Sequence, residues 1–182
     1  MKLLLDSEAV NRGLRRVAGE IAERHRGTQD LILVGVRRGG VPIASRLQGY
    51  LKELEGDVPL GTVDITLYRD DAATALPNPR IGPSDLPHSL AEAHVIIVDD
   101  VLFTGRTIRA AIDALMDYGR PKRIELMVLI DRGGRELPIQ ADYVVRQLEV
   151  PRDQRIDVVA RSGQLEVLGQ PFGSPTIPPE AP

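Results

Sequence analysis

The chain has 182 residues, a formal net charge of -3, no cysteine and 42% hydrophobic residues. This size and composition suit one domain with its own core and exclude disordered and collagen-like chains. The missing cysteines exclude disulfides, thiolate metal sites and a cysteine nucleophile. Because nothing indicates an oxidising compartment, we expect a cytoplasmic protein. No apolar run approaches the ~18 residues of a membrane span, and 3% aromatic residues with an acidic balance give no general reason to expect nucleic-acid binding.

Helical and strand-like patterns alternate over the first part of the chain. Residues 7–26 carry an apolar stripe at helical spacing and predict an amphipathic helix. The continuous apolar run at residues 31–36 is typical of a strand covered on both faces. After the loop at residues 37–40, a second helix is predicted up to Leu54, with Pro42 in its first turn.

A second strand is predicted over residues 58–68, followed by a segment with no regular period. Residues 72–93 contain four prolines, and an insertion of ~20 residues in a compact domain is typical of a functional loop. A tolerated surface insertion is the alternative. We take residues of about 70–93 as a mobile lid.

The rest of the chain returns to alternation. Strands are predicted at 95–98 and 123–130, a helix at 108–115, and shorter strands at 143–145, 156–160 and 165–168. This order predicts an α/β domain over residues 1–170 with a mainly parallel central sheet. The last twelve residues hold five prolines, so residues 171–182 are expected to form a flexible Pro-rich tail.

The strongest chemical signal lies between the strand at 95–98 and the helix after it. Asp99 and Asp100 end the strand, and Thr104-Gly105-Arg106-Thr107 begins the helix. Hydroxyls and unpaired N–H groups at a helix N-terminus favour phosphate. Adjacent carboxylates accept hydrogen bonds from sugar hydroxyls or hold hydrated magnesium. Because ligands bind beyond the carboxyl ends of parallel strands, we predict a ribose 5-phosphate pocket here.

Residues 95–107 resemble the phosphoribosyl-pyrophosphate (PRPP) motif of type I phosphoribosyltransferases. The flanking segments 64–71, 131–139 and 141–144 look like the PyrR family, pyrimidine operon attenuators that are also uracil phosphoribosyltransferases. The resemblance covers residues of about 5–150 and matches only loosely after Val150. It implies the type I phosphoribosyltransferase fold, in which helices flank a central mainly parallel sheet that carries a small hood and a mobile lid.

The resemblance also implies roles for individual residues. The PRPP-binding residues would be Asp99, Asp100, Thr104, Gly105, Arg106 and Thr107, with the two aspartates on the ribose hydroxyls. The pyrophosphate-binding residues would be Arg37, Arg38, Gly39 and Arg69, and the catalytic residues Asp99, Asp100 and Arg69. Asp131, Arg132 and Gly133 would belong to the hood that selects uracil through main-chain groups.

Magnesium is expected to arrive bound to PRPP, without a metal site made by the protein alone. The three histidines, His25, His88 and His94, show no ligand spacing, so we expect them at surface or loop positions.

The implied reaction converts uracil and PRPP to UMP and diphosphate, and the implied regulation is binding of a pyrimidine mRNA leader in response to UMP or UTP. A homodimer or higher homo-oligomer would contact RNA through Arg16, Arg24, Arg135 and Arg146. A phosphoribosyltransferase for another base, such as hypoxanthine, and a nucleotide sensor without turnover are the alternatives.

Several positions depart from the family. Gly19 and Gly134 stand where His is common, Arg38 and Gln140 where Thr and Arg are common, and Phe103 where Tyr is common. The changes at the first four positions remove side chains that could read bases or the ribose hydroxyl of RNA. The change at Phe103 removes a hydroxyl and leaves the turn intact. We therefore expect catalysis to persist and specific RNA binding to be weakened or retuned.

Overall fold

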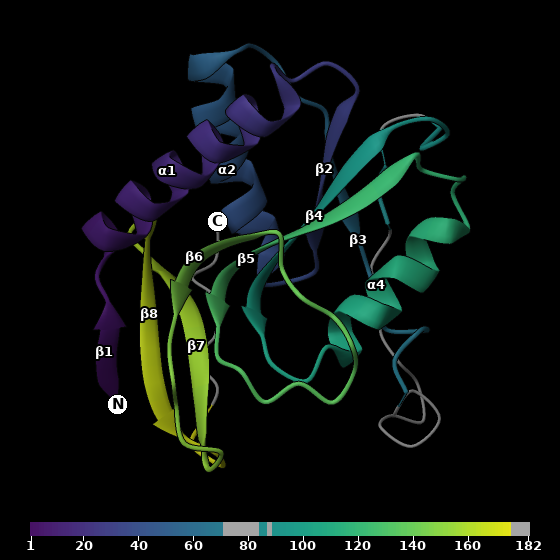
Figure 1. The fold of residues 1–182 in the computed structure, drawn as a ribbon. Coiled ribbons are helices and arrows are strands. Elements are labelled where there is room, and N and C mark those ends of the chain that lie inside the picture. The colour runs from purple at the N-terminus through teal and green to yellow at the C-terminus, as the bar shows by residue number, and fades with distance from the viewer. Residues whose placement is uncertain (71–83, 87–88, 176–182) are drawn as a thin grey trace.

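The computed structural model describes residues 1–70, 84–86 and 89–175, and these contain three helices and eight strands (Figure 1). The elements are β1 (Lys2–Leu5), α1 (Ser7–His25), β2 (Leu31–Val36), α2 (Gly40–Leu54), β3 (Leu60–Val63), β4 (His94–Leu102), α4 (Arg106–Met116), β5 (Arg123–Asp131), β6 (Tyr143–Gln147), β7 (Gln154–Arg161) and β8 (Gln164–Pro171). No helix in the described part of the chain is long and apolar enough to span a bilayer.

The central layer is a five-stranded parallel sheet in the order β3-β2-β4-β5-β6, which confirms the predicted fold class. Helices α1 and α2 cover one face and α4 covers the other (Figure 1). Successive side chains of a strand point to opposite faces. In β4, Ile96 and Val98 therefore join the core under α1 and α2, whereas Val95 and Ile97 join the core under α4. This explains why the strand is apolar without alternation.

A smaller antiparallel sheet, β1-β8-β7, lies beside the parallel one (Figure 1). Strand β1 was missed by the sequence analysis, because four residues without a turn signal carry little pattern of their own. It forms by pairing with a strand more than 160 residues away, with Lys2 opposite Gly169 and Leu3 opposite Leu168. Strand β8 ends at Pro171, and residues 176–182 of the predicted tail lie outside the described residues.

The prediction of a strand over residues 58–68 was wrong beyond Val63. The Asp64 carboxylate accepts hydrogen bonds from the Thr66 backbone N–H (2.9 Å) and hydroxyl (2.5 Å), which turns the chain away from the sheet. Of the lid predicted at about 70–93, residues 71–83 and 87–88 lie outside the described residues. Within its described part, Asp85 forms an isolated antiparallel bridge with Thr62 of β3.

A buried polar cluster lies at the end of the sheet where the parallel strands begin. Glu125 of β5 is 3% exposed, and its carboxylate lies 2.6 Å from His25 Nε2 and accepts a hydrogen bond from the Tyr143 hydroxyl (3.2 Å). Burial, followed by the charge of Glu125, raises the pKa of Tyr143. His25 thus lies inside the protein at the end of α1, so the expected surface position was wrong, and His88 lies outside the described residues.

Candidate active site

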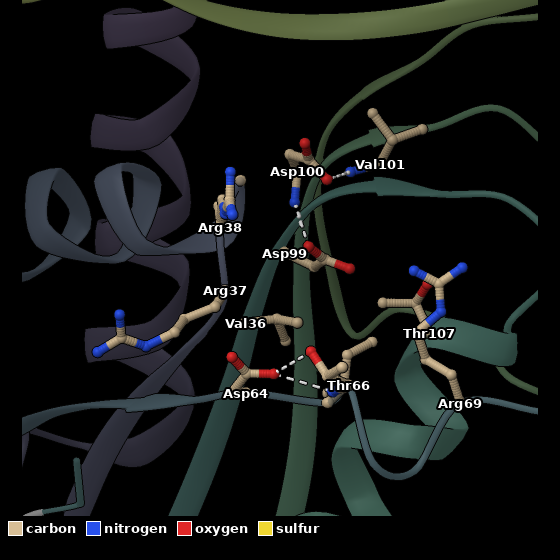
Figure 2. Close-up of a pocket in the computed structure, with 12 residues that line it drawn as sticks. Val36, Arg37, Arg38, Asp64, Thr66, Arg69, Asp99, Asp100, Val101 and Thr107 are labelled. Atoms are coloured by element: carbon tan, nitrogen blue, oxygen red, sulfur yellow. Dashed lines mark hydrogen bonds between the residues drawn. The ribbon is translucent and has the colours of Figure 1, made fainter. Parts of the chain in front are cut away.

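A cavity of about 620 Å³ opens at the carboxyl ends of the parallel strands (Figure 2). It brings together predicted site residues from the loop after β2, the turn after β3, strand β4 and the first turn of α4. These are Arg37, Arg38, Gly39, Arg69, Asp99, Asp100 and Thr107. The location follows the rule for open α/β sheets, in which loops at the carboxyl edge surround the ligand.

The acidic pair, Asp99 and Asp100, lines this cavity and belongs to β4 itself. Asp99 is only 4% exposed, and its carboxylate accepts a hydrogen bond from the Asp100 N–H (2.9 Å). The Asp100 carboxylate accepts one from the Val101 N–H (2.7 Å). Burial, and then the charge of Asp100, raises the pKa of Asp99 well above its ordinary value, and burial also raises the pKa of Asp100. Ligand hydroxyls or a cation would therefore stabilise the ionised pair.

Two glycines allow the loop after β2 to rest directly on the acidic pair. A Cβ atom on Gly39 would lie 2.1 Å from an Asp100 carboxylate oxygen, and one on Gly40 would lie 2.1 Å from the Val98 carbonyl oxygen. Any larger residue would push the loop away from β4. The sequence analysis singled out Gly39 but not Gly40, although the Gly-Gly pair was a visible signal.

The arginines of this loop differ in orientation. Arg37 donates a hydrogen bond to the Thr62 hydroxyl (3.1 Å), so its guanidinium group extends toward β3, while Arg38 lies beside the cavity (Figure 2). The peptide bond that joins these two residues is cis.

The Thr104–Thr107 turn, which we predict to bind phosphate, leads directly into α4. Gly105 precedes α4 with a φ of 93°, a left-handed conformation that glycine adopts without strain. The Thr104 hydroxyl accepts a hydrogen bond from the Arg106 N–H (3.3 Å). The Arg106 side chain points elsewhere, to Asp70 and Glu136. Thr107 lines both the main cavity and an adjacent cavity of about 190 Å³.

The predicted hood residues lie apart from the main cavity. Asp131, Arg132 and Gly133 line a separate cavity of about 420 Å³ at the ends of β5 and β6. Arg132 is 7% exposed, donates to the backbone carbonyls of Pro151 (3.0 Å) and Gln154 (2.8 Å), and has a pKa lowered by burial. Its side chain therefore anchors the segment that leads into β7.

The four arginines predicted to bind RNA have different surroundings. Arg16 and Arg146 line a cavity of about 350 Å³ between α1 and β6. Arg24 stacks on the ring of Tyr143 at 4.7 Å. Arg135 donates hydrogen bonds to the Phe103 and Ile139 carbonyls and to the Asp131 carboxylate.

Two cavity residues, Asp64 and Thr66, were not predicted as site residues. Their alternation with Ile65 resembled the end of a strand. The signal that could have revealed them is an Asp two residues before a Thr, a pair that often closes a turn.

The parallel sheet, with the acidic pair and the Thr104–Thr107 turn at its carboxyl edge, is the arrangement expected of a phosphoribosyltransferase. In agreement, residues 2–160 match the phosphoribosyl transferase domain family, so the chain belongs to it.

Within that family the chain belongs to the PyrR proteins. A relative named bifunctional protein PyrR from Pelotomaculum thermopropionicum is 52% identical over 164 residues, which is 90% of each chain. A protein of the same name from Geobacter sulfurreducens is 52% identical over 158 residues, 86% of this chain and 89% of the relative. The solved hypoxanthine phosphoribosyltransferase of Trypanosoma cruzi shares the fold, with a TM-score of 0.70 at 23% identity over 94% of this chain and 97% of that one.

Proposed function

We propose that this protein transfers the phosphoribosyl group of PRPP to uracil, forming UMP and diphosphate, and that it also regulates pyrimidine operons. The observation that carries the proposal is the main cavity of a PyrR protein, in which the acidic pair lies against the loop that contains Arg38 and Gly39.

The chemistry follows from the charges around this cavity. As the bond between ribose C1 and diphosphate breaks, positive charge develops on the ribose and negative charge on the leaving group. Asp99 and Asp100 would accept hydrogen bonds from the ribose hydroxyls and stabilise the positive charge. Arg38 and Arg69 would stabilise the departing diphosphate. Uracil N1 then bonds to C1 and its proton passes to the departing diphosphate, so orientation and charge stabilisation suffice without a protein nucleophile.

Mg²⁺ fits this site as a partner of the substrate. Proteins bind Mg²⁺ through one or two carboxylates together with substrate phosphates, and Asp99 and Asp100 offer two carboxylates. Within residues 1–70, 84–86 and 89–175, no group of three acidic or histidine side chains is arranged to hold a metal by itself. When bound, Mg²⁺ would neutralise part of the diphosphate charge.

A panel of bases tests the choice of uracil. With PRPP and Mg²⁺ we expect UMP to form at least ~100-fold faster than the nucleotides of hypoxanthine or guanine, because an unmatched base leaves buried polar groups unpaired. Product chromatography with labelled PRPP measures the rates. Faster formation of IMP would support the hypoxanthine alternative, and UMP binding without turnover would support the sensor.

We further propose that the protein acts as a homo-oligomer and that it binds RNA more weakly than its family members. Arg16 and Arg146 would contribute to the affinity that remains. Both line one cavity, and arginines contribute to RNA affinity through phosphate contacts. Affinity for a pyrimidine leader hairpin should rise little with UMP and fall further in Arg146→Ala. Gel-shift titrations at fixed salt measure the RNA affinity. Tight binding that UMP stimulates would contradict the proposal that RNA binding is weakened.

A further inference from the structure

An ion-pair network joins the turn after β3 to α4. The Asp70 carboxylate lies 2.7 Å from an Arg106 guanidinium nitrogen and 2.7 Å from an Arg109 guanidinium nitrogen, one for each oxygen. Arg106 also bonds to Glu136 at 2.8 Å, and Arg109 to Asp113 at 3.0 Å. One carboxylate is thus held by two arginines from the first turn of α4.

The backbone around Arg69 is held by the same helix on both sides. Arg109 donates a hydrogen bond to the Tyr68 carbonyl (3.4 Å), and the Tyr68 hydroxyl donates one to the Asp117 carboxylate. Asp70 follows Arg69 directly and is bound by Arg106 and Arg109, and we call these three residues the clamp. Because consecutive Cα atoms are only ~3.8 Å apart, fixing residues 68 and 70 restricts the position of the Arg69 backbone, from which its side chain extends.

Arg69 lies where this restriction matters for the reaction. It lines both the main cavity and the adjacent cavity shared by Asp70, Arg106 and Thr107. The clamp therefore connects the backbone at Arg69 to α4, and the first residues of α4 belong to the turn that we predict to bind phosphate.

We infer that Asp70 is a positioning residue for the transfer reaction. Clamped by Arg106 and Arg109, it sets Arg69 at a fixed distance from the phosphate-binding turn, so that Arg69 meets the diphosphate when the 5-phosphate is bound. The inference rests on the proposed function. The clamp is 40 to 50% exposed, and exposed ion pairs add little to stability, so its effect is on orientation.

The opposite role is also testable. If Asp70 instead competes with the 5-phosphate for Arg106, removing its charge would tighten PRPP binding. The Asp70→Asn and Asp70→Ala variants distinguish the two roles, with Asp113→Asn as the matched control because it removes the other carboxylate partner of Arg109.

We expect kcat for UMP formation to fall ~10- to 100-fold in Asp70→Ala, because small misplacements of a positioned group have costs of this size. The KM for uracil should change less than about twofold, and the melting temperature should stay close to that of Asp113→Asn. Arg109→Ala should reproduce the loss, and the double variant should be no worse than either single one. Activity of Asp70→Ala equal to the control, or a lower KM for PRPP with unchanged kcat, would overturn the inference.

Binding of inorganic diphosphate with Mg²⁺, measured by calorimetry, separates this inference from the proposed function. We expect Asp70→Ala to weaken it several-fold. If the unaltered protein binds diphosphate but forms no UMP, and Asp70→Ala weakens that binding, the transfer reaction is refuted and the placement of Arg69 by Asp70 stands. If UMP forms and the variant matches the control in both assays, the inference alone fails.

Discussion

Replacing Asp100 with Asn is expected to lower kcat for UMP formation by ~100- to 1,000-fold, the size of effect seen when one preorganised electrostatic group is removed from an active site. The substitution preserves shape, because an Asn side-chain oxygen can still accept the hydrogen bond from the Val101 N–H. It removes a negative charge from beside the ribose at the moment when positive charge develops there. Steady-state kinetics with PRPP and uracil measure the loss.

Asp57→Asn is the control for this prediction. Asp57 pairs with Lys52 at the surface, where its side chain is 84% exposed, and it should leave kcat unchanged. Melting curves of both variants show whether the fold is intact. A folded Asp100→Asn protein that forms UMP at the normal rate would refute the role assigned to this carboxylate.

Glu125→Ala is expected to lower the free energy of unfolding by about 2–6 kcal/mol, because two buried polar groups lose their hydrogen-bond partner at a cost of about 1–3 kcal/mol each. The variant leaves the buried His25 ring and the Tyr143 hydroxyl without their shared carboxylate partner. For a chain of this size, each 1 kcal/mol lowers the melting temperature by about 2–4 °C. Urea unfolding at neutral pH measures the change.

Glu8→Ala provides the matched comparison, since Glu8 forms an ion pair with Arg12 on the surface of α1 at 75% exposure. Its stability should change by less than about 1 kcal/mol. A Glu125→Ala protein as stable as Glu8→Ala would show that the buried cluster contributes little.

Local patterns were enough to predict most of the parallel sheet. The helix at residues 7–26 and the strands at 31–36 and 123–130 matched the structure closely, because their apolar spacing directly reflects which faces are buried. Segments whose structure depends on distant partners were harder to predict. Strand β1 exists because β8 pairs with it, and the strand predicted up to residue 68 ends early because Asp64 binds Thr66.

The sequence by itself determined the class of chemistry. Asp99, Asp100 and the Thr104–Thr107 turn lie close together along the chain, so a phosphoribosyltransferase could be predicted from this segment without coordinates.

Only the tertiary structure decided what several other residues do. Arg132 and Arg135 donate hydrogen bonds to backbone carbonyls, and Asp70 forms an ion pair with Arg109 of α4. Gly40 allows the backbone to pack closely against β4. Each of these contacts joins residues about 20 to 60 positions apart, and a side chain acquires such a partner only when folding brings distant segments together.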